Sequence, residues 1–492
     1  MLISADARYV RDPAALAETV TSLTHGDAAR RAQLESDLRS RRAYVVLAKQ
    51  VPMKEAEYLR KLDLDGVHFT RSSARKYPLN KVAGQLVGLT NVDTGKGIDG
   101  LERVANDALA GHDGSRTEIR DPRLGETVRI QDMQGPRQGK ALTLTINASI
   151  QQQMEVILAG ARNAYKAKTA TGVIMDPNTG AIIAMGTVPR VNPNDRAHLD
   201  PQAARTRAVT DPFEPGSVFK VVTVAGALDE GLTTPSTAYS LPPKIILGKG
   251  TRDEHTVTDS HKRTVWETLT TQEILQQSSN IGTIRLSRLL SRKNLLRSWM
   301  VKFGFGSRTG IDVAGEDAGN LPKLRWNAGQ LGNIPFGQGM TATQLQLVRA
   351  YAAIANGGYL VRPHVVASIG GVPTAVTDRT RIMSPRTSRQ LTKILETVVE
   401  GKGTGVHASL KDYVVAGKTG TAQQVDPKRG VYIDRYRSSF VGFVPAINPR
   451  LLIAVMLDDP DPLGPHTGGD VAAPAFKQIA DYALSTLSIP PG

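Results

Sequence analysis

The sequence predicts an α+β fold in two or more domains, with helices layered on the sheet of one large domain. The chain has 492 residues, of which 40% are hydrophobic, and this is more than one ordinary core accommodates. Within residues 141–492, strand-like segments stand at both ends and helical segments fill the middle. Residues 135–139 hold two glycines and a proline and separate this stretch from a different pattern before it.

Residues 1–140 are predicted to form a smaller domain with its own pattern. Apolar residues set among charged ones across residues 12–64 indicate two short helices. Residues 88–100 are rich in Gly, Asn and Asp, which is typical of turns. Residues 116–120 and 126–130 alternate in the manner of strands.

The large domain is predicted to begin with a strand at residues 141–146 and a helix at residues 149–165. Two strands within residues 172–185 follow, and the turn Pro-Asn-Thr-Gly at residues 177–180 joins them. The remaining expected elements are helices at residues 217–232, 268–290, 343–356 and 473–487, and strands at residues 414–416, 439–444 and 451–457.

Composition excludes several classes of function. The chain has 61 Lys and Arg against 46 Asp and Glu, a formal charge of +15, but no basic run is interleaved with aromatic residues. We interpret the charge as a solvated surface and expect no nucleic-acid partner. The chain has no cysteine, so disulfides and thiol catalysis are excluded. The nine histidines, among them His255 and His261, show no ligand spacing, so we expect no metal and no cofactor.

Ser217 and Lys220 are the first candidates for chemistry. A serine hydroxyl is a weak nucleophile until a nearby base takes its proton. On a helix, positions i and i+3 share a face, so Lys220 can reach the Ser217 hydroxyl. The helix after Ser217 is apolar nearly all round, which predicts burial, and burial lowers the pKa of a lysine so that it can act as a base. Taken alone, the same pair also fits a helix-capping serine followed by a surface lysine.

A second Ser-x-x-Lys pattern shows how weak the pair is alone. Ser73 and Lys76 match it equally well. Arg71 and Arg75 surround this copy, and Pro78 follows in place of an apolar helix. A lysine there is expected to stay solvated and protonated, so we do not expect this copy to be catalytic.

Two later motifs favour Ser217. Ser278 and Asn280 form a Ser-x-Asn triplet in a mostly helical region, where a helix break can point a hydroxyl and an amide into a cleft. The segment Lys418-Thr419-Gly420-Thr421 has the alternation of a strand, and Gly420 allows a second backbone to lie close to it. An edge strand of this kind can pair with an extended peptide while Lys418 and the threonine hydroxyls face an anionic group.

The order Ser-x-x-Lys, Ser-x-Asn, Lys-Thr-Gly resembles the penicillin-recognising serine transpeptidases. Longer segments resemble class B penicillin-binding proteins, and the last of them resembles the tail of the division-specific members. Residues 91–102 look like part of the non-catalytic pedestal of that family. The segments in the large domain are residues 213–217, 337–344, 351–358, 416–423 and 468–476.

The resemblance implies the architecture in more detail. Residues 1–140 correspond to an elongated α+β pedestal of the dimerisation type. Residues 141–492 correspond to the penicillin-binding transpeptidase domain, with an antiparallel five-stranded sheet flanked by helices and an all-helical subdomain.

The resemblance also implies the reaction, a serine D,D-transpeptidase cross-linking peptidoglycan through an acyl-Ser217 intermediate that β-lactams also form. Ser217 attacks the penultimate D-Ala carbonyl, Lys220 takes the proton, Ser278 relays it to the leaving amine, and Asn280 holds the donor peptide and orients Lys220. The N–H groups of Ser217 and Thr421 are expected to form the oxyanion hole. The expected substrate-binding residues are Lys418, Thr419, Gly420 and Thr421.

Three other functions remain open at this point. A serine β-lactamase needs a deacylating base, and the sequence has no Glu-x-x-Leu-Asn segment to supply the class A glutamate. A D,D-carboxypeptidase would use the same site with water as the acceptor. A non-catalytic divisome scaffold would not need the motif residues, which are all present.

Location and partners follow from the resemblance as well. Family members carry a short cytoplasmic tail, one membrane helix and an Arg/Gly/Asp box ahead of the pedestal, and the printed sequence shows none of these. We therefore expect an N-terminally truncated form of a protein anchored at the extracytoplasmic face of the bacterial cell membrane, acting in septal wall synthesis. Expected partners are peptidoglycan stem peptides ending in D-Ala-D-Ala, β-lactam antibiotics, a lipid-linked-glycan polymerase and divisome membrane proteins.

Overall fold

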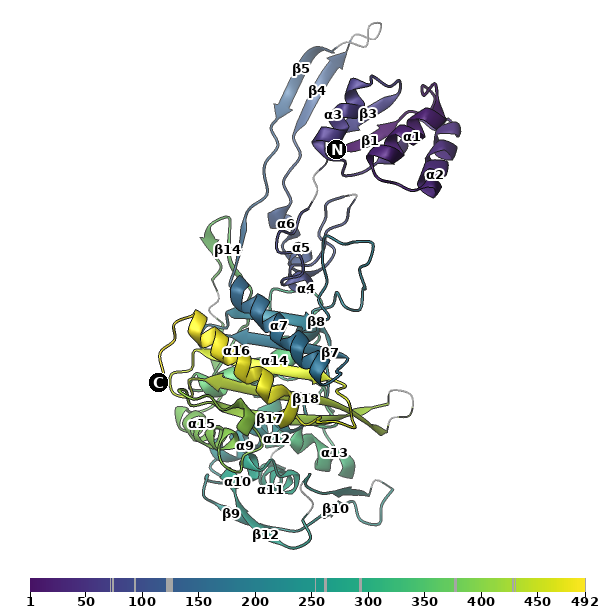
Figure 1. The fold of residues 1–492 in the computed structure, drawn as a ribbon. Coiled ribbons are helices and arrows are strands. Elements are labelled where there is room, and N and C mark those ends of the chain that lie inside the picture. The colour runs from purple at the N-terminus through teal and green to yellow at the C-terminus, as the bar shows by residue number, and fades with distance from the viewer. Residues whose placement is uncertain are drawn as a thin grey trace. The chain divides into compact units, whose positions relative to one another are not determined.

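The structure is a computed structural model, and the chain in it divides into two compact units (Figure 1). The first unit comprises Met1–Pro78 and Thr90–Ile98, and the second comprises Leu79–Leu89 and Asp99–Gly492. Ser73 of the second Ser-x-x-Lys copy and His261 lie outside the described residues. The structure describes residues 1–492 except 71, 73–74, 93, 121–126, 253, 261–262, 292–293, 376–377, 427–428, 430 and 492.

The first unit is a small α+β layer with its own core. Its antiparallel sheet has the strand order β2-β1-β3, and Ile3 at its centre is fully buried. The sequence predicted two short helices here, but the described part of the unit also contains a third helix and this sheet. The elements are β1 (Leu2–Ala5), α1 (Pro13–Leu23), α2 (Ala28–Arg39), β2 (Val45–Ala48), α3 (Met53–Lys61) and β3 (Val67–Thr70).

The second unit begins with short helices and a long hairpin. The helices are α4 (Gly84–Val87), α5 (Gly100–Val104) and α6 (Asn106–Leu109). The antiparallel strands β4 (Ser115–Arg120) and β5 (Thr127–Gln134) confirm the two strands predicted in this region.

A five-stranded antiparallel sheet forms the centre of the second unit and confirms the predicted fold class. The strand order is β17-β18-β19-β7-β8, so two strands from the start of the large domain join three strands from its end. The strand β17, which carries the Lys-Thr-Gly motif, lies at the edge. The bounds are β7 (Thr169–Met175), β8 (Ile182–Val188), β17 (Ala416–Val425), β18 (Tyr432–Val444) and β19 (Leu451–Asp458).

Helices cover both faces of this sheet, and side-chain alternation along the strands divides the core between them. In β19, Ile453 and Val455 belong to the core beneath α7 (Ala148–Ala164) and α16 (Ala473–Thr486), which lie side by side in Figure 1. Leu452 and Ala454 face the opposite core. There, Gln344 of α14 (Gln344–Ala355) donates hydrogen bonds to the carbonyls of Thr171 and Ala454, 3.3 and 3.1 Å away.

Several further strands and two helices belong to the large domain. The predicted strand at residues 141–146 is β6 (Leu142–Leu144), which pairs with β14 (Val366–Ile369) in a separate three-stranded sheet. Within the described ranges, no helix combines the length and the apolar composition that crossing a bilayer requires. The other elements of this region are α8 (Arg207–Thr210), β13 (Tyr359–Val361), β15 (Val372–Pro373), β16 (Arg379–Arg381) and α15 (Pro385–Val399).

The middle of the domain is mainly helical. The predicted helical stretch at residues 268–290 is divided into β12, α10 and α11: β12 pairs with β9, and the chain turns between the two helices at residues 277–279, where Ser278 has a φ of 59°. Two short two-stranded sheets accompany the helices. The elements are β9 (Ala238–Leu241), β10 (Ile245–Leu247), β11 (His255–Val257), β12 (Glu267–Thr270), α10 (Thr271–Gln276), α11 (Asn280–Leu290), α12 (Leu295–Lys302) and α13 (Ala328–Asn333).

Candidate active site

Ser217 lies at the start of the most buried helix of the domain. A 3-10 turn, η1 (Gly216–Phe219), leads directly into α9 (Lys220–Asp229). Gly216 has a φ of 59°, which favours glycine, and its N–H donates to the Gly337 carbonyl at 2.9 Å. Ser217 is half-buried, whereas its neighbours Val218 and Phe219 are buried. The sequence therefore folds so that the hydroxyl stands at the surface end of an apolar helix.

Lys220 follows Ser217 by three residues, nearly one helical turn, and is fully buried. Its side chain is 0% exposed, and burial lowers its pKa to about 7, a shift that the Asp259 carboxylate partly opposes. The Nζ atom donates to the carbonyl oxygen of Ser278 at 2.5 Å and to its Oγ at 3.1 Å. These hydrogen bonds go to Ser278 and not to Ser217. The amine is thus held in place and can accept a proton near neutral pH.

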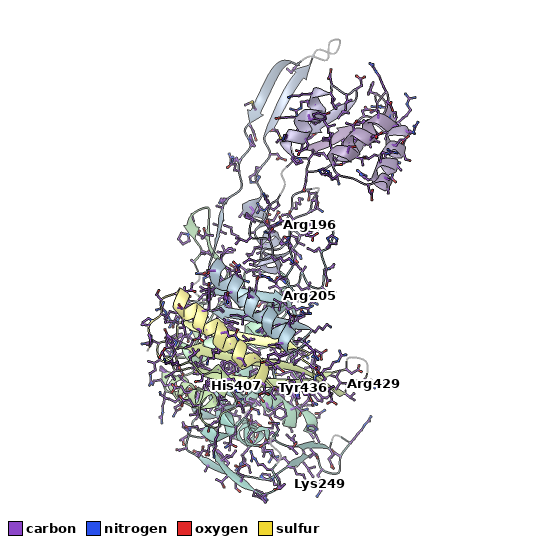
Figure 2. The ribbon with its side chains drawn as sticks, viewed as in Figure 1. Arg196, Arg205, Lys249, His407, Arg429 and Tyr436 are labelled. Carbon is purple, nitrogen blue, oxygen red and sulfur yellow. The ribbon has the colours of Figure 1, made fainter. Side chains whose placement is uncertain are left out.

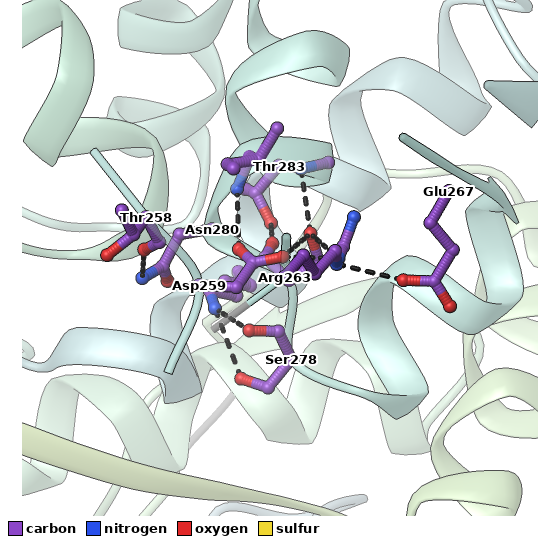
Figure 3. Close-up of polar contacts among 11 residues, drawn as sticks. Thr258, Asp259, Arg263, Glu267, Ser278, Asn280 and Thr283 are labelled. Carbon is purple, nitrogen blue, oxygen red and sulfur yellow. Dashed lines mark hydrogen bonds and ion pairs between the residues drawn. The ribbon is translucent and has the colours of Figure 1, made fainter. Parts of the chain in front are cut away.

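The turn between α10 and α11 presents the Ser-x-Asn triplet (Figure 3). Ser279 caps α11, since its Oγ accepts a hydrogen bond from the Gly282 N–H at 2.9 Å. The Asn280 amide donates to the Thr258 carbonyl at 3.0 Å. The structure therefore brings Ser278 to Lys220, while the hydrogen bond of Asn280 goes to Thr258.

Two residues that the sequence reading did not single out support this turn. Asp259 is buried, and its carboxylate accepts hydrogen bonds from the Ile281 N–H at 2.9 Å and from the Ser279 hydroxyl at 2.8 Å. Arg263 forms an ion pair with Asp259 and donates to Ser279 Oγ at 3.0 Å. The spacing Asp-x-x-x-Arg is the one signal in the sequence, and it is too common to mark a site.

The motif strand β17 places its lysine inside the protein. Lys418 is 0% exposed, and burial and the nearby Lys220 lower its pKa well below the usual value. Its Nζ lies 3.2 Å from the Thr419 carbonyl oxygen and 3.3 Å from Thr419 Oγ1. The Thr419 hydroxyl is also 2.6 Å from Thr404 Oγ1. Both motif lysines are thus buried, and they lie close enough for the charge of one to affect the pKa of the other.

The start of the nucleophile helix packs tightly against β17. A Cβ at Gly420 would lie 2.5 Å from Ser439 Oγ and 3.0 Å from Val218 Cγ1, so a side chain does not fit there. A Cβ at Gly216 would lie 3.1 Å from the Cβ of Ala422. The structure therefore brings Ser217 beside the middle of β17, in agreement with the close approach that the sequence predicted for Gly420.

A π-helical turn, η5 (Gly468–Ala472), supports the same strand. The Gly468 N–H donates to Thr421 Oγ1 at 3.0 Å, and the Gly469 carbonyl oxygen accepts from His407 Nδ1 at 3.1 Å. Next to it, the ring of Tyr436 stacks on His466 with centroids 4.4 Å apart. Figure 2 labels His407 and Tyr436. The Thr421 hydroxyl is therefore engaged with η5.

No metal site accompanies these residues in the described part of the chain, where His, Asp and Glu do not gather in a group of three or more that could hold an ion. The reactive groups in view are a hydroxyl, two buried amines and an edge strand. Such a set fits acyl transfer to a serine.

Two family profiles match the chain. The profile of the penicillin-binding protein transpeptidase domain matches residues 170–481, and that of the penicillin-binding protein dimerisation domain matches residues 3–144. Together with the five-stranded sheet and the site beside its edge, they define the class of protein, which is a penicillin-binding transpeptidase preceded by a dimerisation domain.

Individual relatives narrow the class. The chain is 34% identical over 449 residues to the peptidoglycan D,D-transpeptidase FtsI of Escherichia coli K12, covering 91% of this chain and 73% of the relative. It is 34% identical over 473 residues to the penicillin-binding protein PbpB of Mycolicibacterium smegmatis, covering 92% and 71%. Penicillin binding protein 3 of Mycobacterium tuberculosis, complexed with aztreonam, matches with a TM-score of 0.76 at 31% identity, covering 87% and 92%. The chain belongs to the class B penicillin-binding proteins and is a transpeptidase enzyme.

Proposed function

We propose that this chain is a serine D,D-transpeptidase that cross-links peptidoglycan stem peptides through an acyl-Ser217 intermediate. The observation that carries the proposal is the state of Lys220. A fully buried amine with a pKa of about 7, three residues after a half-buried serine, supports Lys220 as the group that accepts the serine proton. The motif residues around it come from three separate segments of the chain.

The first half-reaction forms the acyl-enzyme. Ser217 Oγ attacks the penultimate D-Ala carbonyl carbon, and its proton passes to Lys220. The proton then reaches the leaving amine through Ser278, whose Oγ lies 3.1 Å from Lys220 Nζ. The C–N bond breaks, and the terminal D-Ala departs. In the second half-reaction, an amine of a neighbouring stem peptide attacks the acyl carbon, the C–O bond to Ser217 breaks, and the proton that the amine loses returns to Ser217 Oγ through Lys220 and Ser278.

Substrate binding falls to the edge of the sheet. An extended stem peptide pairs with β17, which is an edge strand. Lys418, with Thr419, Gly420 and Thr421, binds the terminal carboxylate and keeps the site positive. The N–H groups of Ser217 and Thr421 form the oxyanion hole, and Asn280 holds the donor peptide.

The wider role rests on the relatives. One of them is named FtsI, and the structures of penicillin binding protein 3 include complexes with aztreonam and ampicillin. From these relatives we infer that β-lactams acylate Ser217. We also infer that the protein acts in septal wall synthesis at the extracytoplasmic face of the membrane, with a glycan polymerase and divisome proteins as partners. Residues 1–140 serve as the pedestal and residues 141–492 as the transpeptidase domain.

Labelling with a fluorescent penicillin tests the proposal. The labelled chain is digested, and the adduct is located by peptide mass. We expect the adduct on Ser217, no label in Ser217→Ala, and full label in the control Ser291→Ala, which removes an exposed serine at the end of α11. Label that survives Ser217→Ala would overturn the assignment. Fast release of the label would indicate a β-lactamase, and release of D-Ala to water without cross-linking would indicate a carboxypeptidase.

A further inference from the structure

A buried carboxylate that the proposed mechanism does not use lies next to the active-site turn. Asp259 follows β11 and is 6% exposed. Its Oδ1 accepts from the Ile281 N–H at 2.9 Å, and its Oδ2 accepts from the Ser279 hydroxyl at 2.8 Å. The Arg263 guanidinium contacts the same Oδ2, as Figure 3 shows. Asp259 thus contacts the turn at Ser279, the start of α11 at Ile281, and Arg263.

These contacts determine the shape of the turn that carries Ser278. Ser278 has a φ of 59°, a left-handed conformation that costs a residue with a side chain about 1–2 kcal/mol. Such a conformation persists when the neighbouring residues are held. Asp259 holds Ser279 by its hydroxyl and α11 by the second of its N–H groups, at Ile281. The preceding residue, Thr258, holds Asn280 through its carbonyl.

The conformation of this turn also determines the position of the Lys220 amine. Both the carbonyl and the hydroxyl of Ser278 accept from Lys220 Nζ, at 2.5 and 3.1 Å. A small rotation of the turn would move both acceptors together. Asp259 is therefore connected to Lys220 through two consecutive residues: it accepts a hydrogen bond from Ser279, and Ser278 accepts from Lys220.

Asp259 also acts on Lys220 through its charge. Among the described residues, the charged groups near this amine are Lys418, on β17, and the Asp259 carboxylate, which is paired with the Arg263 guanidinium. A positive charge on Lys418 would disfavour one on Lys220, whereas the Asp259 carboxylate favours it. Arg263 neutralises part of the Asp259 charge and forms a second ion pair, with the half-exposed Glu267, at 2.9 Å.

We propose that Asp259, held by Arg263, is a positioning residue of this active site: it fixes the turn that presents Ser278 and Asn280, and its negative charge acts on the Lys220 amine. The proposal rests on the proposed function, and it identifies the groups that control the base. It predicts that the two members of one ion pair have opposite effects on the pH dependence of acylation.

The test is the second-order rate constant of acylation by a fluorescent penicillin, measured against pH on the full chain. In Asp259→Asn, the Lys220 ammonium loses its stabilising charge, so the rising limb of the profile moves to lower pH, by on the order of one pH unit. In Arg263→Gln, the Asp259 charge is no longer neutralised, so the limb moves to higher pH. The plateau rate of Asp259→Asn falls by about tenfold to a hundredfold, because the turn is less well held.

Controls separate charge from folding. Arg263→Lys keeps the positive charge, so the rising limb of its pH profile is expected to stay where it is in the unchanged chain. If Asp259→Asn does not fold, the upward shift in Arg263→Gln, measured against Arg263→Lys, still tests the charge effect. Glu267→Gln removes a carboxylate that is 45% exposed and pairs with Nε of Arg263, so the rising limb is also expected to stay in place. Thermal unfolding reports whether each variant is folded.

The outcomes distinguish this inference from the proposed function. If the unchanged chain is not labelled on Ser217, the proposed function is wrong. If it is labelled, but Asp259→Asn and Arg263→Gln shift the limb in the same direction or not at all, the positioning role of Asp259 is wrong and the proposed function stands. Opposite shifts, with Glu267→Gln unmoved, support the inference.

Discussion

Two fully buried lysines share the active site, and each determines what the other can do. Burial lowers the pKa of both, and the positive charge of Lys220 lowers that of Lys418 further. A substrate carboxylate beside Lys418 would raise its pKa again and so favour the charged form of Lys418. A positive charge on Lys418 would in turn favour the neutral form of Lys220, the form that the proposed mechanism needs.

The first prediction concerns the stability that Lys220 costs the fold. Its pKa is about 7 in the folded chain and 10.5 in the unfolded chain, so stability is greatest above 10.5 and is lost as the pH falls towards 7. Lys220→Met removes the amine and keeps a side chain of similar length. We expect this variant to slow penicillin acylation by about a thousandfold or more. Its free energy of unfolding is expected to equal or exceed that of the unchanged chain.

Urea unfolding at several pH values measures this effect. The advantage of Lys220→Met is expected to grow from high pH down to about 7, to on the order of a few kcal/mol, offset by the unpaired Ser278 acceptors. The matched control is Lys393→Met on α15, because the Lys393 amine is exposed and forms an ion pair with Glu396. An advantage that does not change with pH, or one that Lys393→Met shares, would contradict the argument.

At this scale, the sequence identified the groups that stand in ordered motifs. Lys220 is hydrogen-bonded to Ser278, and the segment of Ser217 packs against β17, while the catalytic roles stay predictions. Asp259 was not found, because its partners lie up to 22 positions away and no periodicity connects them. Contacts of this kind become visible once the chain has folded.

Among the elements, the sharpest constraint is the close packing around the nucleophile turn. Gly337 has a φ of 85°, accepts the Gly216 N–H, and leaves no room for a Cβ, which would lie 2.4 Å from the Gly216 carbonyl oxygen and 2.6 Å from Phe219 Cβ. Gly357, at the end of α14, has a nearly equal φ of 82°, and nothing lies within 4 Å of a Cβ there. The two glycines share a left-handed backbone conformation, which would strain any other residue, and they differ in how closely other atoms pack around them.

This pair supplies the second prediction. Gly357→Ala is expected to cost about 1–2 kcal/mol from the left-handed backbone alone. Gly337→Ala adds the overlap with the nucleophile turn, so we expect a further loss of about 1–3 kcal/mol and slower acylation of Ser217. Chemical denaturation gives the two free energies, and fluorescent penicillin gives the rates. If the two variants lose the same free energy of unfolding, the turn at Ser217 can move to accommodate the added Cβ, and the packing argument is wrong.

Periodicity predicted the long elements well and the short ones poorly. The hairpin of β7 and β8 and the helices α7, α14 and α16 stand where the pattern placed them. The three strands of the first unit have four residues each, too few for an alternation to stand out. The break at residues 277–279 depends on contacts with Asp259, which a local pattern does not contain.

For the whole molecule, the open question is where the catalytic unit begins. The sequence placed the boundary at residues 140 and 141, from a Gly/Pro-containing linker, and it stays a prediction. In the structure, residues 79–89 belong to the second unit, where Leu86 is 1% exposed and Gln85 Nε2 donates to the carbonyls of Thr187 and Pro189, both at 3.0 Å. The linker composition carries no information about these contacts, because they join segments about a hundred residues apart.

The third prediction compares two shortened chains. A chain of residues 141–492 loses the buried side chains of Leu86 and Leu101 and leaves the buried Glu155 carboxylate without the Ala83 N–H, which lies 2.9 Å from it. Burying two leucines is worth about 3–6 kcal/mol, so we expect its melting temperature to fall by on the order of 10 °C relative to residues 79–492.

A chain of residues 79–492 keeps these contacts, so we expect it to retain both the melting temperature of its catalytic unit and the penicillin acylation rate of the full chain. Differential scanning calorimetry and fluorescent penicillin measure the two quantities. Leu86→Ala in the full chain is the internal control, and it should lower the stability of the catalytic unit by about 2–5 kcal/mol without changing the first unit. If residues 141–492 melt as high as residues 79–492, the segment before residue 141 does not support the catalytic unit, and the boundary predicted from the linker is the functional one.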